Sequence, residues 1–193
     1  MFIQTETTPN PSTIKFLPGQ TVLESGTVEF SAPDQSGPSP LAQRLFSLQG
    51  VKRILVAGEY IAVSKAEDTD WNVLKPMVLG VLMDHFSTGA PVLDPAYAPH
   101  EGLDKPDNGN EDDEISLQIR ELIETRVRPM VAMDGGDIVF ESFQGGIVTL
   151  QMRGACSGCP SATMTLKSGI EKMLRHYIPE VTEVRAAGEN DWA

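Results

Sequence analysis

Residues 154–160 have the sequence GACSGCP. An alternating pattern typical of a strand precedes them, and a helical pattern follows. Pro160 suits the first turn of that helix, so the stretch predicts a strand-to-helix loop with two cysteines beside the helix N-terminus. The helix dipole and the free N–H groups at such a position stabilise thiolate. We therefore expect the sulfurs of Cys156 and Cys159 to be solvent-accessible and to contribute nothing to the core.

Outward from this loop, the segment 114–193 predicts the order helix, strand, strand, helix, strand. The first helix has an apolar face, and Pro129 is expected to kink or end it. Gly145-Gly146 lies between the first two strand patterns and indicates a hairpin. Such an order packs two helices on one face of a three-stranded sheet. The expected elements are a helix from about residue 114 to 130, strands 138–143 and 147–151, a helix from 160 to 177 and a strand 181–186.

Residues 1–90 predict a second small domain that mixes strands and helices. Short alternating patterns indicate strands, Val51–Ala57 and Tyr60–Ser64 indicate a hairpin, and Pro40 begins a short helix. Asp70 is expected to cap a longer helix, which begins near Pro76 or kinks there. The fold class is α+β: two small mixed domains joined by an acidic linker.

The linker is predicted at residues 91–113, which are rich in proline and glycine and end in an acidic run. We expect it to be flexible. The domain organisation is therefore a domain at 1–90, a linker at 91–113 and a domain at 114–193.

The composition excludes several classes of function. The 193 residues carry 15 basic and 27 acidic side chains, a net charge of −12, which argues against binding to nucleic acid. The longest apolar stretch, residues 78–83, is too short to span a membrane. Residues 1–6 have neither a basic region nor an arginine-rich pattern, so we expect no secretory or transit peptide.

The two cysteines are the only ones in the sequence, which excludes a four-cysteine site within one chain. The pair could be a dithiol redox site, a structural zinc site or half of a shared iron–sulfur cluster, and thiols without a role are a further alternative. Zinc takes four ligands, and the second segment adds only His176 to the pair. A cluster takes four thiolates, so two chains related by a twofold axis would be needed. Stoichiometry alone leaves zinc and a cluster at a dimer interface equally open.

Several stretches of the second segment resemble the C-terminal domain of NifU, also called the Nfu domain. Residues 126–140 resemble its entry motif, residues 154–161 and 165–171 its cluster-binding signature, and residues 178–181 its ending. The resemblance spans nearly all of 114–187.

The first segment resembles the N-terminal domain of mitochondrial-type Nfu proteins, the type also found in alphaproteobacteria. The stretches that carry the resemblance are residues 1–5, 8–11, 15–16, 70–71 and 74–76. The whole chain is thus similar to the two-domain Nfu class.

This resemblance implies an iron–sulfur cluster scaffold and carrier rather than an enzyme. On the family pattern, Cys156 and Cys159 are the ligands of a [4Fe–4S] cluster, or of a [2Fe–2S] cluster, that bridges a homodimer. The implied partners are upstream assembly proteins and client apoproteins. Mitochondrial members of the family carry a transit peptide, and residues 1–6 do not indicate one, so the resemblance implies a bacterial cytoplasmic protein, or a mitochondrial matrix protein if the chain is a processed eukaryotic form. The alternative is a thiol–disulfide or persulfide oxidoreductase that uses the same pair.

Other polar and apolar residues have simpler interpretations. A tight turn is expected at Asp134–Asp137 rather than a metal site. Surface or helix-end positions are expected for the three histidines, His85, His100 and His176. Core positions are expected for Trp71 and for three methionines, Met152, Met164 and Met173.

Overall fold

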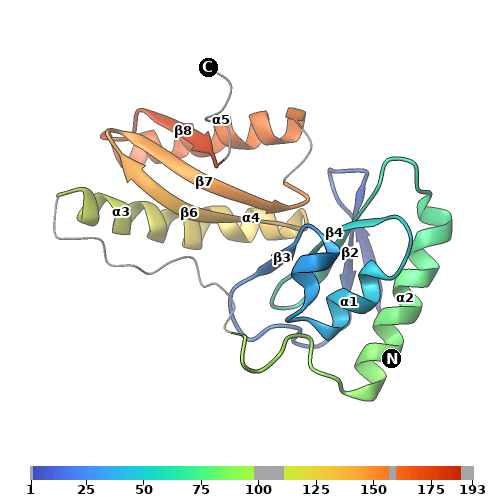
Figure 1. Cartoon of the computed structure of the whole chain (residues 1–193). Helices are drawn as coiled ribbons and strands as arrows, with labels where there is room; N and C mark the ends of the chain where they lie inside the picture. The colour runs from blue at the N-terminus through green and yellow to red at the C-terminus, as the bar shows by residue number, and fades with distance from the viewer. Residues whose placement is uncertain (1, 98–110, 157–159, 188–193) are drawn as a thin grey trace. The chain divides into compact units, whose positions relative to one another are not determined.

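A computed structural model describes residues 2–97, 111–156 and 160–187 of the chain. The chain divides into two compact units, Met1–Glu101 and Gly102–Ala193, each with its own hydrophobic core (Figure 1). Both units mix helices with a sheet, which confirms the predicted α+β class with two small domains.

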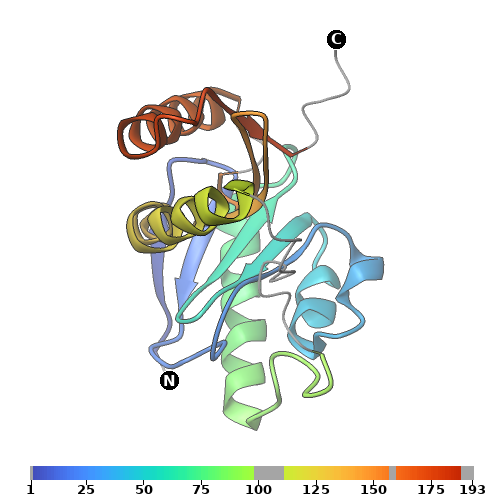
Figure 2. The same cartoon turned by 90° about the vertical axis from the view of Figure 1, so that its left-hand side faces the viewer.

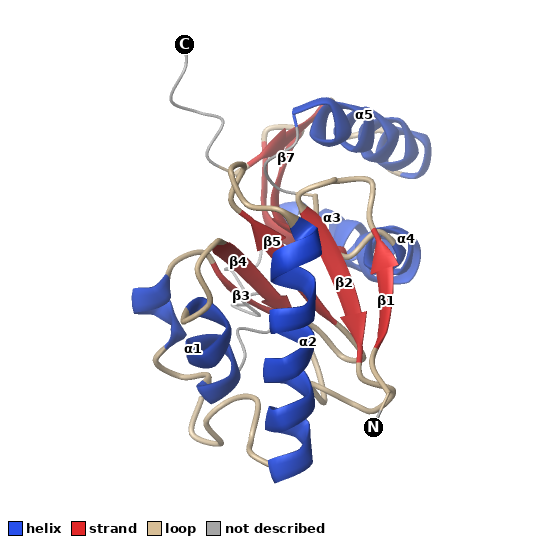
Figure 3. Ribbon diagram, turned by 90° about the vertical axis from the view of Figure 1, so that its right-hand side faces the viewer, coloured by secondary structure: helices blue, strands red, loops and turns tan. Residues whose placement is uncertain are grey.

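The first unit is built on a five-stranded antiparallel sheet with the strand order β1-β2-β5-β4-β3. Two α-helices cover the same face of this sheet (Figure 3). The largest buried side chains of that face, among them Phe16, Ile54 and Ile61, pack against them. The elements are β1 (Gln4–Thr7), β2 (Thr13–Leu17), β3 (Val28–Phe30), the 3-10 helix η1 (Pro33–Ser36), α1 (Pro40–Phe46), β4 (Val51–Val56), β5 (Ile61–Lys65) and α2 (Trp71–Thr88).

Both helices of this unit begin at side-chain caps. The Ser39 hydroxyl accepts a hydrogen bond of 3.0 Å from the backbone N–H of Ala42, and Pro40 is the first residue of α1. The Asp70 carboxylate accepts one of 2.9 Å from the backbone N–H of Asn72. The helix α2 therefore begins at Trp71 and runs through Pro76 instead of beginning near it.

The second unit has the predicted order of elements. Its sheet has the strand order β6-β7-β8, with the first pair antiparallel and the second parallel. Both helical segments lie on one face of this sheet (Figure 2). The elements are α3 (Glu111–Leu122), the π-helix η2 (Ile123–Val127), α4 (Arg128–Met133), β6 (Gly136–Gln144), β7 (Ile147–Gly154), α5 (Pro160–Tyr177) and β8 (Glu183–Ala186).

The hairpin between β6 and β7 turns at Gly145-Gly146, as the sequence predicts. Their φ angles are 57° and 83°, the left-handed conformation that a two-residue hairpin turn requires at both positions.

The first helical run of this unit continues past Pro129 to Met133 instead of ending at the proline. Just before it, the backbone N–H of Arg128 bonds to the carbonyl of Ile123, a π-helical spacing. A proline ring clashes with the carbonyl four residues earlier, and a widened turn relieves that clash.

Folded structure extends into the predicted linker from both sides. Val92, Leu93 and Tyr97 pack against the core of the first unit, and the Ser39 hydroxyl donates a hydrogen bond of 2.6 Å to the carbonyl of Val92. At the other side α3 begins at Glu111. The interval 98–110 lies outside the described residues, as does His100. In the described parts of the chain, every helix is too short or too polar to cross a bilayer.

His85 lies in the last turn of α2, as the helix-end alternative predicts, but it is fully buried, so the surface alternative is wrong. Among the described residues, neither ring nitrogen has a partner at full hydrogen-bond geometry, although the carbonyls of Ala90 and Pro91 lie close enough to favour its proton in part. Burial and the nearby positive charge of Arg44 lower the pKa of His85 below its usual value. The carbonyls of Ala90 and Pro91 and the charge of Asp84 oppose that shift only in part. The first unit therefore buries a neutral imidazole with unsatisfied polar atoms, which costs stability.

The substitution His85→Leu should raise the free energy of unfolding by about 1–2 kcal/mol at pH 7, because it removes an unsatisfied buried polar group. The gain should be larger at pH 5. A histidine whose folded pKa is depressed adds no proton-linked penalty above its unfolded pKa of 6.5, and it destabilises the fold progressively as the pH falls below that value, because only the unfolded chain then takes up the proton. Urea unfolding at both pH values measures this, with exposed His176→Leu as the control. A less stable His85→Leu protein would contradict the prediction.

Candidate functional site

Three elements of the second unit meet at the end of its sheet that bears the cysteine loop. Gly136, the first residue of β6, pairs with Gly154, the last residue of β7. Cys156 follows two residues later, and α5 begins at Pro160. Cys159, the second predicted ligand, lies outside the described residues.

Cys156 is only 7% exposed and belongs to the hydrophobic core of the second unit. The predicted exposed sulfur and absence from the core are therefore wrong for this cysteine. The physical reason is a tie to the preceding turn: the backbone N–H of Ala155 donates a hydrogen bond of 3.2 Å to the carbonyl of Gly135. This tie draws the start of the loop against the beginning of β6.

The close approach of the loop to β6 depends on Gly136. A Cβ atom at this position would overlap with Cys156 Sγ. It would also lie 3.0 Å from the carbonyl oxygen of Arg153 and 3.1 Å from the backbone nitrogen of Cys156. Any side chain at residue 136 would thus displace the cysteine, the backbone or both.

The surroundings of Cys156 favour the neutral thiol. Burial, together with the negative charges of Asp134 and Asp137, raises the pKa of Cys156 to about 12. The predicted stabilisation of thiolate by the helix N-terminus is outweighed at this residue, because desolvation and two carboxylates act against the charge. At neutral pH the thiol is protonated and must lose its proton before it binds a metal.

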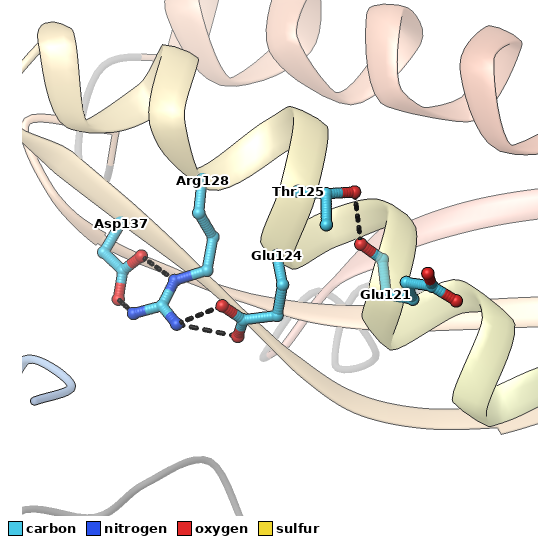
Figure 4. Close-up of polar contacts among 5 residues, drawn as sticks. All are labelled: Glu121, Glu124, Thr125, Arg128 and Asp137. Carbon is cyan, nitrogen blue, oxygen red and sulfur yellow. Dashed lines mark hydrogen bonds and ion pairs between the residues drawn. The ribbon is translucent and has the colours of Figure 1, made fainter.

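A buried ion pair holds the helical run against the start of β6 (Figure 4). The guanidinium of Arg128 donates two hydrogen bonds to the Asp137 carboxylate, Nε to Oδ1 at 2.8 Å and Nη2 to Oδ2 at 3.1 Å. Its Nη1 donates to both carboxylate oxygens of Glu124, at 2.7 and 2.9 Å. Asp137 is 3% exposed, and its partner is half-buried.

This pair is costly to break from one side. Burial opposes the charge of Arg128, yet the hydrogen bonds and charges of Asp137 and Glu124 raise its pKa above the ordinary value. Loss of one partner from a fully buried pair costs about 3–5 kcal/mol. The cost here is smaller, because the side chain of Arg128 is partly exposed and also pairs with Glu124. The residue next to Gly136 is therefore locked to α4, which restrains the strand where it meets Cys156.

Sequence reasoning assigned no role to Arg128 and treated Gly136 and Asp137 only as parts of a turn. The turn itself is present: the backbone N–H groups of Asp134 and Gly135 bond back to Val131 and Ala132. Within the described ranges, no three His, Cys, Asp or Glu side chains are grouped to hold a metal ion. The sequence does contain a signal for this ion pair: Arg128 precedes Asp137 by nine positions, and Asp137 lies where a strand is expected to begin.

Comparison with known families agrees with this architecture. A family model described as "NifU-like domain" matches residues 119–185, which cover the cysteine loop and its supporting elements. A second, described as "Scaffold protein Nfu/NifU N terminal", matches residues 3–89. The second unit is thus a NifU-like domain. The chain as a whole belongs to the family of two-domain Nfu proteins.

Curated relatives match nearly the whole chain. The human protein named "NFU1 iron-sulfur cluster scaffold homolog, mitochondrial" is 43% identical over 192 residues, 99% of this chain and 74% of that protein. The Drosophila persimilis protein of the same name is 46% identical over 187 residues, 95% of this chain and 64% of that protein. A solved NifU-like protein from Saccharomyces cerevisiae aligns with 49% of this chain and 86% of that one, at 25% identity and a TM-score of 0.45.

The substitution Gly136→Ala should lower the free energy of unfolding of the second unit by about 1–3 kcal/mol, because overpacking forces Cys156 and the backbone to shift. The matched control is Gly169→Ala in α5, where a Cβ meets nothing within 4 Å. That control should stabilise by about 0.5–1 kcal/mol, since alanine is the better helix former. Chemical denaturation of both variants checks the contrast, and equal effects would contradict the packing argument.

Proposed function

We propose that this chain is an iron–sulfur cluster carrier that holds one cluster between two copies of itself and delivers it to apoproteins. The proposed ligands are Cys156 and Cys159 of each copy, and the proposed cargo is a [4Fe–4S] cluster. The observation that carries the proposal is a cysteine pair that lies inside the matched NifU-like domain and supplies half of a cluster's ligands. The relatives named as iron–sulfur cluster scaffolds support the same class of function.

Ligand arithmetic supports the shared site. A cluster takes four thiolates, and the sequence has two cysteines. A twofold dimer supplies the missing pair symmetrically. The cluster is cargo in this proposal: the chain binds it and releases it by exchange with client thiolates, without turnover of a substrate. The expected partners are client apoproteins and upstream assembly proteins.

The buried thiol of Cys156 favours the carrier over the oxidoreductase. An oxidoreductase that used Cys156 as its attacking thiol would need a thiolate at neutral pH, and burial with two nearby carboxylates raises the pKa of Cys156 to about 12. A carrier needs the thiolate only while metal is bound, and metal binding releases the proton.

The proposed cellular location is consistent with the proposed function. The mitochondrial relatives suggest the mitochondrial matrix for a eukaryotic form, and the bacterial cytoplasm is the proposed location otherwise.

Anaerobic loading with ferrous iron and sulfide tests the function. The wild-type chain should gain a broad brown chromophore and about four irons per dimer. Cys156→Ser and Cys159→Ser should each lose at least about nine-tenths of the bound iron, since each removes a ligand from both copies. The control is His176→Ala, which removes the histidine that a zinc site would use and should load fully.

Native mass spectrometry of the loaded protein decides the stoichiometry. A cluster found on a single chain, or full loading without Cys159, would contradict the shared site. Transfer to an apoprotein that is no faster than loss to a chelator would contradict delivery. Disulfide exchange activity without cluster binding would favour the oxidoreductase.

A further inference from the structure

Three methionines are strongly exposed in the second unit: Met130 and Met133 of α4 and Met164 of α5, at 57, 75 and 72%. The predicted core position is wrong for Met164, whereas Met152 and Met173 are partly buried and pack against the core. Exposure of several large apolar side chains costs solvation free energy unless a partner covers them.

These methionines lie at the end of the unit that bears the cysteine loop. Met130 and Met133 are three residues apart on one helix, so they share a face. The helix that carries them ends at Met133, two residues before Gly135, whose carbonyl accepts the hydrogen bond from Ala155. Met164 lies in the second turn of α5, beyond the loop. Figure 1 shows the end of α4, the end of β7 and the start of α5 at one end of the sheet.

The same end is poor in negative charge. Residues 142–170 contain no Asp or Glu, and neither does α4, although the whole chain has a net charge of −12. Of the two acidic residues near the start of β6, Asp137 in the strand is buried against Arg128, and Asp134 in the preceding turn is exposed. Two copies of a strongly acidic chain repel each other over most of their surface. The end of the second unit that bears the cysteine loop has few acidic residues, so two copies can approach each other there with less repulsion.

We propose that Met130, Met133 and Met164 form a methionine collar, an apolar contact surface that packs against a second copy of this chain around the shared cluster. The inference rests on the proposed function, because a bridging cluster forces the two cysteine loops to face each other. Residues around each loop then meet their counterparts across the twofold axis. Unbranched methionine side chains adapt to such a contact, and their burial excludes water from the cluster.

Glutamate substitutions in the full-length chain test the collar. Met133→Glu, Met164→Glu and the double variant are loaded anaerobically with ferrous iron and sulfide, and the dimer is measured by analytical ultracentrifugation. Burial of one methionine side chain is worth enough to change association about tenfold. Each single variant should therefore raise the dissociation constant of the loaded dimer at least about tenfold, and the double variant more. Met133→Leu should stay within about twofold of wild type.

Met77→Glu and Met83→Glu are matched controls, because these methionines are also exposed but lie on α2 of the first unit. Both should dimerise as wild type does. Glutamate collar variants that dimerise normally would overturn the collar while the cluster proposal stands. A loss confined to delivery, with the dimer intact, would assign the surface to clients and also overturn it. If the wild-type chain loads no bridging cluster, the collar falls together with the proposed function.

Discussion

The contact between Gly136 and Cys156 is the constraint on which the geometry of the cysteine loop depends. Because residue 136 has no side chain, the loop after β7 approaches the start of β6 closely enough for the sulfur to enter the core. The hydrogen bond from Ala155 to Gly135 holds that approach, and the Arg128–Asp137 pair fixes the strand beside it. A turn, a strand start and a helical run are thus all arranged around one thiol.

This arrangement connects packing with chemistry. A buried neutral thiol stabilises the empty domain, and a thiolate is the form that binds iron. If the chain carries a cluster as proposed, loading would have to move Cys156 or its surroundings, at least enough to remove a proton and admit metal. In the proposed carrier, this cost weakens binding of the cargo and so favours its release to a client. The dimer contact, which the collar would provide, offsets part of the cost while the cluster is held.

Local patterns predicted most of the fold. The glycine pair at 145–146 has a single good explanation, a two-residue hairpin turn, and the apolar faces of the helices indicated the side that packs on the sheet. The π-helical segment before Pro129 was not predictable. The sequence shows that a proline interrupts a helical pattern, but it does not show whether the helix ends, kinks or widens at that point. The same holds for His85, whose burial depends on how α2 packs on α1 and the sheet rather than on its own neighbours in sequence.

The site was predicted in part for a similar reason. The spacing of the cysteines and the helix that follows are local features, and they led to the loop. The burial of Cys156 depends on Gly136, twenty positions earlier, and its pKa depends on that burial and on the carboxylates of Asp134 and Asp137 near the start of β6. Such contacts join residues that are distant in sequence and form only when β6 and β7 pair. A pattern of adjacent residues therefore does not predict them. Met164 illustrates the opposite error, since its helical spacing suggested the core and its side chain is exposed.

The reactivity of Cys156 tests the central claim, that the unloaded domain buries this cysteine as a neutral thiol. In a Cys159→Ser protein, Cys156 is the only cysteine, and its alkylation by iodoacetamide at pH 8 can be timed in the folded chain and in urea. Burial and a pKa of about 12 predict that the folded chain reacts at least about tenfold more slowly than the unfolded chain. A folded chain that reacts as fast as the unfolded one, or faster, would contradict the account and restore an exposed thiolate at the helix N-terminus.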